Sequence, residues 1–428
     1  MSFAANASKQ YGIAAATSDV PLQLGSSTLS KPLPSETKIV SVPTQSANAG
    51  PGGNQIFQLP TGSGTGFIKP NSMYLAFDVA ATGQVGGGAN WNWQGPTRSA
   101  SSLINRLTVQ IGSTNVEQIN NYNILHDQLL LHTANYSYFN TDSNIIEGTA
   151  SAAYAGPINA AVASYTVPLI SSLFSNEKAV PTFLFQGPIT VLLDYNSLLN
   201  TIQDGTVAFT ATNYTISNAR IVYETIAVDE SYKQGVKAML AEGRLFQMNL
   251  VSYMNLQVAL NDNVNYTIGA NLSSIKGLLY SASAGTGANA AVAVAAGAFA
   301  SGRPMFNVVN NAQTCQQNFR LYLDGRLVNQ LQNLNTRNVV FSEMNRTVSN
   351  MFDTNSTSVD AVNYLNATFV GGINTNRFNE RMAMCGSPAQ NLNFIYEAAG
   401  TAGGNLYVNI IYDQVLVCDA LGSVSMVR

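Results

Sequence analysis

Two stretches of the chain decide its fold because they repeat each other: VQIGSTNVEQINNYN at residues 109–123 and LYLDGRLVNQLQNLN at residues 321–335. They align without a gap, and their apolar residues fall at the same positions. The identical pairs are Val116 with Val328, Gln118 with Gln330, Asn121 with Asn333, and Asn123 with Asn335. Apolar and polar residues alternate at the start of the first stretch, which is typical of a half-buried strand. Similarity at a fixed offset indicates an internal repeat of β-rich units.

A second pair of similar stretches follows the first pair in the same order: IVYETIAVDE at 221–230 and IIYDQVLVCD at 410–419. One such match could arise by chance between β-rich segments, whereas two in the same order favour a duplicated chain. The second copy is shorter between its two matches. We therefore expect it to carry shorter loops in that interval.

The rest of the chain also has the texture of an all-β protein. Segments rich in β-branched and aromatic residues alternate with Gly, Pro and Asn clusters, which favours a sandwich or a jelly roll over a βαβ fold. The segments are Ser72–Val79, Ile104–Ile111, Pro188–Tyr195, Val207–Thr212, Arg220–Val228, Phe319–Leu323 and Leu406–Val417. The best helix prediction is Glu230–Glu242, which Gly243 is placed to end. Leu169–Asn176 is predicted to form one or two helical turns.

Length and repeat together predict how the chain divides. A chain of 428 residues is too long for one compact core, so two domains are expected. We predict an N-terminal arm at 1–36, a first β domain at 37–230, a helical linker at 231–244 and a second β domain at 245–428. The arm is rich in Ser, Ala, Pro and Gln and is expected to be extended. The Gly- and Ala-rich stretch 281–302 is expected to be a long loop.

Charge is scarce along the whole chain. Charged residues make up 10%, against about 25% in ordinary soluble domains, and the net charge is −3. Weak repulsion between copies suits a protein that packs against itself, although a secreted or surface-layer β protein could have the same bias. No cluster of Lys and Arg occurs, so direct neutralisation of nucleic acid is not expected. If the chain coats a genome, an inner membrane or another protein should face that genome.

Cysteine usage and the N-terminus indicate neither a disulfide framework nor export. The three cysteines, Cys315, Cys385 and Cys418, are widely spaced and are expected to be free thiols. The first twelve residues lack the basic and apolar regions of a signal peptide. The most apolar run, 288–300, is too short and too weakly hydrophobic to span a bilayer.

Little in the sequence points to catalysis or metal binding. His126 and His132 are the two histidines, and no GxSxG or HExxH motif accompanies them, so both are expected to be structural. The acidic residues Asp229, Glu230, Asp413 and Asp419 are expected at strand ends or turns, as solvated or capping carboxylates. The stretch after Asp353 is too loose for a calcium loop. We predict no catalytic residue, no cofactor and no metal site.

Two motifs have a binding interpretation as well as a structural one. Trp91 and Trp93 could stack on a sugar, but between Gly88 and Gly95 they are expected to anchor a loop. The glycine-rich stretch 62–66 lacks the lysine of a P-loop, and Pro70 opposes the helix that a nucleotide loop needs, so a plain loop is expected.

The layout of the chain resembles the double jelly-roll major capsid proteins of tailless icosahedral DNA viruses and bacteriophages. The stretches that carry the resemblance are 167–194, with Val167-Pro-Leu and Ala179-Val-Pro, the strand 219–230, the strand 411–419 and the Gly-containing tail 422–428. The resemblance spans most of the chain after the arm and is one of layout, without a catalytic signature.

That resemblance implies a fold and an assembly. The fold would be two tandem eight-stranded jelly rolls with short helices and an extended N-terminal arm. Three copies would form a homotrimeric, pseudo-hexagonal capsomer of an icosahedral virion, and 281–302 is the expected outer tower loop. The partners would be neighbouring capsomers, penton and minor capsid proteins, with room for an internal membrane. Assembly would take place in the host cytoplasm.

Three functions from different classes remain open at this point. The leading one is a self-assembling, non-enzymatic capsid protein. The second is an exported surface-layer or adhesin-type β-sandwich protein, which would need export information. The third is a carbohydrate-binding or glycan-processing β protein that uses Trp91 and Trp93.

Overall fold

The computed structural model describes most of the chain after the predicted arm. The described residues are 35–82, 91–148, 163–204, 213–283, 317–328, 337–352, 359, 364, 368–376, 386–398 and 404–428, except 47, 94, 98, 136–137, 139–140, 177 and 261–262. The predicted arm before Ser35, the tower loop after Ser283, the strand 207–212, Asp353, Cys315 and Cys385 lie outside these residues.

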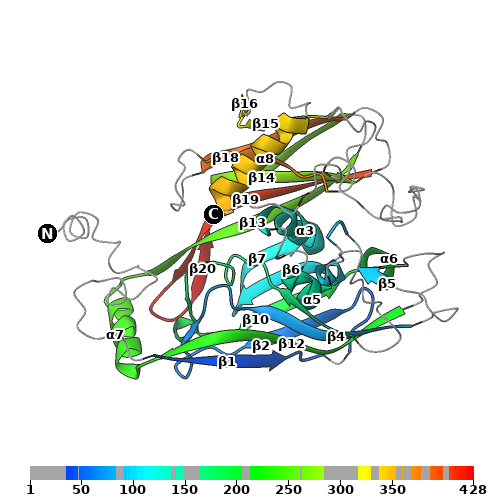
Figure 1. The fold of residues 1–428 in the computed structure, drawn as a ribbon. Coiled ribbons are helices and arrows are strands. Elements are labelled where there is room, and N and C mark those ends of the chain that lie inside the picture. The colour runs from blue at the N-terminus through cyan, green and yellow to red at the C-terminus, as the bar shows by residue number, and fades with distance from the viewer. Residues whose placement is uncertain are drawn as a thin grey trace.

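The first half of the chain forms one jelly roll, coloured blue to green at the bottom of Figure 1. Its strands are β1 (Ser35–Pro43), β2 (Asn54–Leu59), β3 (Phe67–Ile68), β4 (Tyr74–Thr82), β5 (Trp91–Trp93), β6 (Ile104–Ile111), β7 (Thr114–Asn120), β8 (Ala163–Pro168), β9 (Val180–Pro181), β10 (Ile189–Tyr195), β11 (Ile202–Asp204) and β12 (Asn213–Val228). Its helices are η1 (Ala100–Leu103), α3 (Tyr122–Thr133), α5 (Asp142–Glu147), η2 (Thr182–Leu184) and α6 (Leu198–Thr201).

The second half forms another roll, coloured green to red above the first. Helix α7 (Glu230–Ala241) lies between the halves in sequence, at the lower left of Figure 1. The elements that follow are β13 (Phe246–Leu260), β14 (Asn263–Ser283), β15 (Gln317–Leu323), β16 (Arg326–Leu327), α8 (Arg337–Phe352), β17 (Gly371–Asn374), β18 (Ser387–Ala398), β19 (Gly404–Cys418) and β20 (Val424–Val427).

Two large antiparallel sheets make the first roll, and β5 and β11 form a small two-stranded sheet of their own. One has the order β8-β4-β12, with β1 on the other side of β12, and the other has the order β2-β10-β6-β7. Side chains alternate between core and surface, as in β10, where every second residue from Ile189 to Tyr195 is buried. The two inner faces therefore enclose one apolar core between the sheets.

The second roll repeats all six of these strand pairings. β13 pairs with β19, β19 with the second part of β14, and that part of β14 with β17. The first part of β14 pairs with β18, β18 with β15, and β15 with β16. β14 thus takes the places of both β2 and β4, and it bends where its register shifts between Gly269 and Ile275. The chain is all-β, with two tandem eight-stranded jelly rolls, as predicted.

Both repeated stretches occupy equivalent places in the two rolls. Residues 109–120 form the hairpin β6–β7 and residues 321–327 form the hairpin β15–β16, and each hairpin is followed by a long helix, α3 or α8. The second match is the last strand of each roll, β12 or β19, which pairs with that roll's first strand. The connection before it is long in the first roll (196–212) and short in the second (399–403), so the expected shorter loop is confirmed.

Two sequence predictions of helix have different outcomes. Helix α7 is confirmed within one residue at its C-terminal end. The predicted helical turns at Leu169–Asn176 are a single hydrogen-bonded turn, with the Ser175 N–H donating to the Ser171 carbonyl at 2.8 Å. The Ser175 hydroxyl also donates to the Leu169 carbonyl, and such side-chain bonds to the backbone compete with helix continuation.

Candidate functional site

The two rolls meet along strand β7 of the first roll and β13 of the second, and a buried carboxylate lies at this contact. Glu117 on β7 accepts hydrogen bonds from the Ser171 hydroxyl at 2.7 Å and the Ser172 N–H at 2.8 Å. It also accepts one from the hydroxyl of Ser252 on β13 at 3.3 Å. Burial raises the pKa of Glu117 to about 7, and the hydrogen bonds from Ser171, Ser172 and Ser252 oppose that rise. This carboxylate therefore holds groups of both rolls.

A chain of side-chain amides also crosses between the rolls. Asn121 donates to Asn255 at 3.0 Å, Asn255 to Asn409 at 2.6 Å, and Asn409 to Gln128 at 2.6 Å. Gln128 in turn donates to the hydroxyl of Ser281 at 2.8 Å. Asn121 and Gln128 belong to the first roll, and the other three belong to the second. Gln128 and Asn409 are fully buried, so water cannot replace these bonds.

The C-terminal segment adds a third connection between the rolls. Strand β20 pairs with β19, and the carbonyl of Val424 accepts a hydrogen bond from the Thr114 hydroxyl at 2.7 Å. The Gln186 N–H donates to the Gly422 carbonyl at 3.2 Å. Gly422 has φ +79°, and a Cβ there would lie 2.6 Å from the Leu184 carbonyl. Only glycine fits this close approach, so the C-terminal segment packs directly against the first roll.

The structure buries both histidines. His126 lies on α3, with Nε2 3.5 Å from a carboxylate oxygen of Glu147 on α5, and Ser99 donates to that same oxygen. Burial lowers the pKa of His126 to about 4 and raises the pKa of Glu147 to about 7, so the pair is neutral near pH 6. Burial also lowers the pKa of His132 to about 3. Both histidines lie on the same helix, α3.

The four acidic residues have different surroundings. Asp229 and Glu230, at the start of α7, are exposed, as expected for solvated carboxylates. Asp419 accepts the N–H groups of Leu421 and Ser423 in a turn, as expected for a capping carboxylate. The prediction that Asp413 lies at a strand end or turn is wrong. It is buried within β19, 3.1 Å from Lys276, and Ser274 donates to it at 2.5 Å.

Four further observations concern metal sites, membrane helices, sugar stacking and phosphate binding among the described residues. In the part of the chain that the structure describes, no three His, Cys, Asp or Glu side chains gather as a metal site. None of the helices described is long and apolar enough to cross a membrane. Trp93 is buried edge-on against Tyr165, at 5.1 Å between ring centroids, so it offers no open stacking face. The glycine-rich stretch 62–66 is a turn before β3, as expected.

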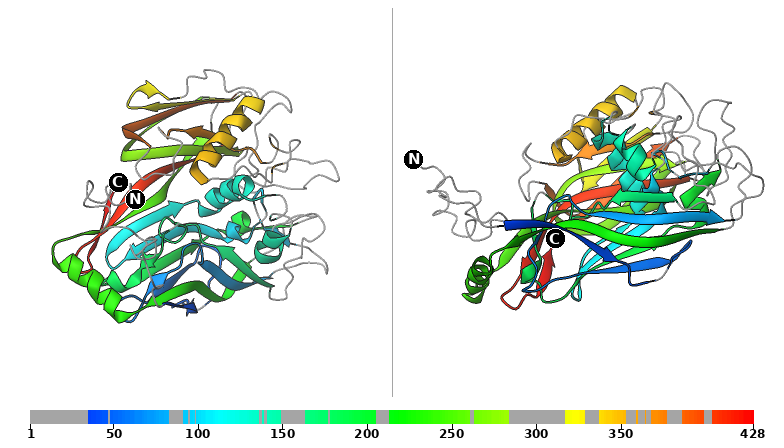
Figure 2. Two further views of the ribbon diagram at one scale, coloured as in Figure 1. Left: turned by 60° about the vertical axis from the view of Figure 1, so that its left-hand side comes forward. Right: turned by 60° about the horizontal axis from the view of Figure 1, so that its bottom comes forward.

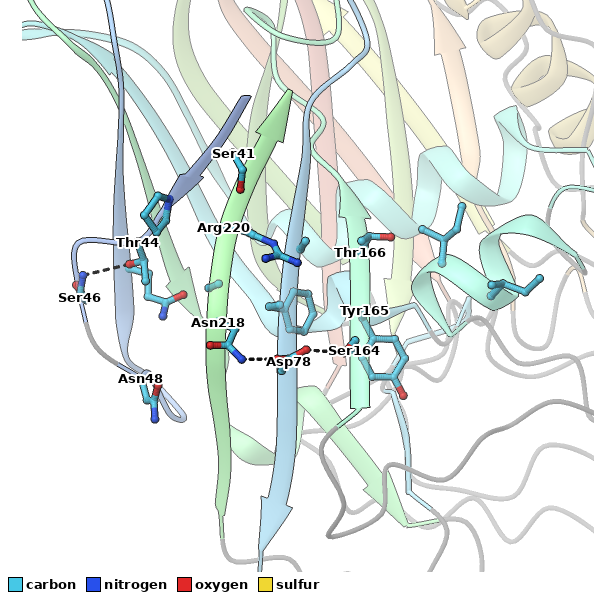
Figure 3. Close-up of a pocket in the computed structure, with 17 residues that line it drawn as sticks. Ser41, Thr44, Ser46, Asn48, Asp78, Ser164, Tyr165, Thr166, Asn218 and Arg220 are labelled. Carbon is cyan, nitrogen blue, oxygen red and sulfur yellow. Dashed lines mark hydrogen bonds between the residues drawn. The ribbon is translucent and has the colours of Figure 1, made fainter. Parts of the chain in front are cut away.

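A groove of about 800 Å³ lies on the outer face of the first roll, between the turn after β1 and helix α5. Figure 3 shows its lining, with Asp78 held between Ser164 and Asn218. Ser164 donates to Asp78 at 2.5 Å and Asn218 at 2.6 Å, and these bonds keep the pKa of Asp78 below its usual range. Asn218 has φ +52° at the point where the register of β12 shifts, which aims its amide at Asp78.

Comparison with solved structures places this architecture among known folds. PBCV-1 VP54, from a crystal structure fitted into a reconstruction of the virophage Sputnik, is 12% identical over 95% of this chain and 99% of its own, with a TM-score of 0.62. The Faustovirus major capsid protein is 8% identical over 91% of this chain and 92% of its own, with a TM-score of 0.56. The mavirus major capsid protein is 11% identical over 94% of this chain and 92% of its own, with a TM-score of 0.51.

Neither a protein-family model nor a curated protein sequence matches the chain. At identities this low the likeness establishes the fold. The chain has the double jelly-roll fold of these capsid proteins, over nearly its whole length and nearly the whole of theirs.

Proposed function

We propose that this chain is a major capsid protein that assembles as trimeric, pseudo-hexagonal capsomers into an icosahedral virion shell, with no enzymatic role. The observation that carries the proposal is the fixed joining of two equivalent rolls. Glu117, the buried amide chain and the C-terminal segment hold the rolls together as one body. Three such bodies supply six similar rolls, which suits a building block that tiles hexagonally.

The division of the chain follows from this proposal. The proposed division is an arm at 1–36, a first roll at 37–230, a helical linker at 231–244 and a second roll at 245–428. The observed elements move two of these limits slightly, because β1 begins at Ser35 and α7 at Glu230. The place of α7 between β12 and β13 supports the linker. Low charge supports broad contact between copies, since the cores of large obligate interfaces are depleted in charge.

The proposed partners and location extend the same argument. The capsomer contacts neighbouring capsomers in the virion, and penton and minor capsid proteins close the shell. An internal membrane fits beneath it. With a net charge of −3 and no basic cluster, the chain makes no direct, sequence-specific contact with nucleic acid. Assembly takes place in the host cytoplasm, where free thiols persist.

Light scattering after size exclusion tests the proposal. Purified protein at micromolar concentration should elute with three times the chain mass, and negative-stain micrographs should show six-lobed particles. A stable monomer would contradict the proposal. Recovery of the protein from a secreted fraction without virions would favour the exported surface-layer function instead.

A further inference from the structure

A lysine and an aspartate face each other inside the second roll, on strands that are neighbours in its sheet (Figure 2). Lys276 belongs to β14 and Asp413 to β19, and Nζ of the lysine lies 3.1 Å from Oδ1 of the aspartate. The two side chains are only 9% and 3% exposed. Within the described ranges, every other ion pair between a lysine and a carboxylate has at least one exposed member. This pair is therefore shielded from water in a way that the others are not.

The backbone around Lys276 is fixed by neighbouring strands. The register between β14 and β19 shifts between Ile275 and Gly277, so Lys276 lies at an irregularity of the kind that re-aims a side chain. The N–H of Thr375 donates to the Lys276 carbonyl at 3.0 Å, and the Thr375 hydroxyl donates to the Ile275 carbonyl at 2.5 Å. The amine and the carboxyl group are thus held close together, which is the condition under which neighbouring groups react readily.

The two oxygens of Asp413 have different partners. Oδ1 faces the ammonium group, whereas Oδ2 accepts the hydroxyl of Ser274 at 2.5 Å. The Ser274 oxygen in turn accepts the N–H of Gly386 at 2.9 Å. The Lys276 ammonium has three N–H donors, and among the described residues Asp413 is its one polar partner. A buried ion pair with so few hydrogen bonds recovers little of its lost hydration, so a reaction that removes both charges is favoured.

We propose that Lys276 and Asp413 condense to an isopeptide bond, which joins β14 to β19 covalently. One ammonium proton passes to Oδ1, and the lone pair left on Nζ attacks Cγ of Asp413. The Cγ–Oδ1 bond then breaks, and a second proton from the nitrogen lets Oδ1 leave as water. The ion pair itself thus supplies every atom and proton of the step. Oδ2 stays as the amide oxygen, where the Ser274 hydroxyl stabilises the negative charge that develops during the attack.

The bond goes beyond the proposed capsid function and does not depend on it. Strand β19 fills the place between β13 and β14, and the bond fastens it there once it has been inserted. Residues 276 to 413 become a closed loop that unfolding cannot open, which restricts the unfolded chain as a disulfide does.

Intact-mass spectrometry of unfolded protein tests the bond by comparing Lys276→Arg with Lys69→Arg. The two variants have the same composition, so their masses are equal unless one of them has lost water. Lys69 also lies close to a carboxylate, 2.6 Å from Glu224, but that pair is exposed. Lys69→Arg should keep the isopeptide bond and be lighter than Lys276→Arg by one water molecule. Equal masses would overturn the proposal.

Tryptic mapping of the unfolded wild type gives a second readout. Trypsin does not cleave after an acylated lysine, so Lys276 should remain uncut within a branched peptide that contains Asp413. A cyclic imide at Asp413 would lose the same water, but it would leave linear peptides cleaved after Lys276, and that result would also overturn the proposal. The capsid function is tested by the mass of the oligomer, so either proposal can fail without the other.

Discussion

Replacing Asn409 by alanine should weaken the protein by far more than the loss of one polar side chain normally does. The change leaves two groups without their hydrogen-bond partner. They are the Nδ2 group of Asn255, which donates to Asn409, and the Oε1 atom of Gln128, which accepts from Asn409. Leaving the fully buried Gln128 without its partner should lower the free energy of unfolding by about 2–3 kcal/mol. Leaving the part-buried Asn255 without its partner should lower it by about 1 kcal/mol. The expected loss in the free energy of unfolding is therefore about 3–4 kcal/mol.

The matched control is Asn393→Ala on β18. Its amide also makes two side-chain hydrogen bonds, to Asn265 at 2.8 Å and Thr267 at 2.7 Å, but these are exposed. Water replaces them, so the control should cost no more than about 0.5 kcal/mol. The comparison isolates burial, because residue type, substitution and number of bonds are the same.

Denaturant titration at one protein concentration measures both variants. Both tryptophans of the chain, Trp91 and Trp93, belong to the first roll, so their fluorescence follows that roll, whereas far-UV circular dichroism follows both. The two signals should change together in the wild type and separate in Asn409→Ala, because the amide chain couples the rolls. A loss below about 1 kcal/mol, no larger than that of Asn393→Ala, would refute the reasoning.

Three further predictions concern the buried groups and the tail. Since burial raises the pKa of Glu117 to about 7 from the ordinary 4.5, this carboxyl contributes stability that is full below pH 4.5 and is lost as the pH rises to about 7. Denaturant titrations of Glu117→Gln and of the wild type at each pH give the difference between their free energies of unfolding, variant minus wild type. This difference should rise by up to about 1.4 kcal/mol per pH unit between pH 5 and 6.5. A difference that does not change with pH would contradict the expectation. Gly422→Ala should lower the free energy of unfolding by more than about 1 kcal/mol, because the backbone there has φ +79° and the new Cβ would lie too close to the Leu184 carbonyl. Gly235→Ala on α7, with open space around it, should raise the free energy of unfolding by about 0.5–1 kcal/mol. Equal melting temperatures of the two variants would contradict both expectations. Burial raises the pKa of the Cys418 thiol to about 12, so native protein at pH 8 should leave Cys418 unmodified by iodoacetamide in peptide mapping, and rapid labelling would show the site to be open.

The features that the sequence predicted correctly are those that depend on local residue patterns. Alternation in 109–123 and in 321–335 specifies the two hairpins, and their fixed offset specifies the duplication. Helix α7 was predictable because its exposed and buried residues alternate with helical period and Gly243 follows it. These signals lie within a few residues of each other and need no knowledge of the tertiary fold.

Helix α3 was missed for an equally physical reason. Ten of its residues are buried, on every side of the helix, so it lacks the polar face that identifies an amphipathic helix. The signal that could have found it is composition, since Leu125–Leu131 holds three consecutive leucines and no β-branched residue. Asp413 was misjudged because Lys276, the cation that allows its burial, comes from another strand of the same roll.

The amide chain between the rolls could not be predicted at all. Asn121 and Gln128 belong to α3 and its N-cap, Asn255 to β13 and Asn409 to β19. Nothing in the local sequence indicates that these four amides meet. The same holds for Glu117, whose hydrogen-bond donors come from a turn of the first roll and a strand of the second. Contacts between distant elements depend on the assembled fold.

The place of β19 also governs how a newly made chain can fold. This strand, Gly404–Cys418, lies between β13 and β14, so the second roll has a gap in its sheet until residues 404–418 have left the ribosome. The first roll can close once β12 is available, nearly two hundred residues earlier. Synthesis therefore yields a finished first roll next to an open second one, with the unpaired edges of β13 and β14 exposed to neighbouring nascent chains. A chain that terminates early cannot complete its second roll, which keeps truncated products out of any ordered assembly.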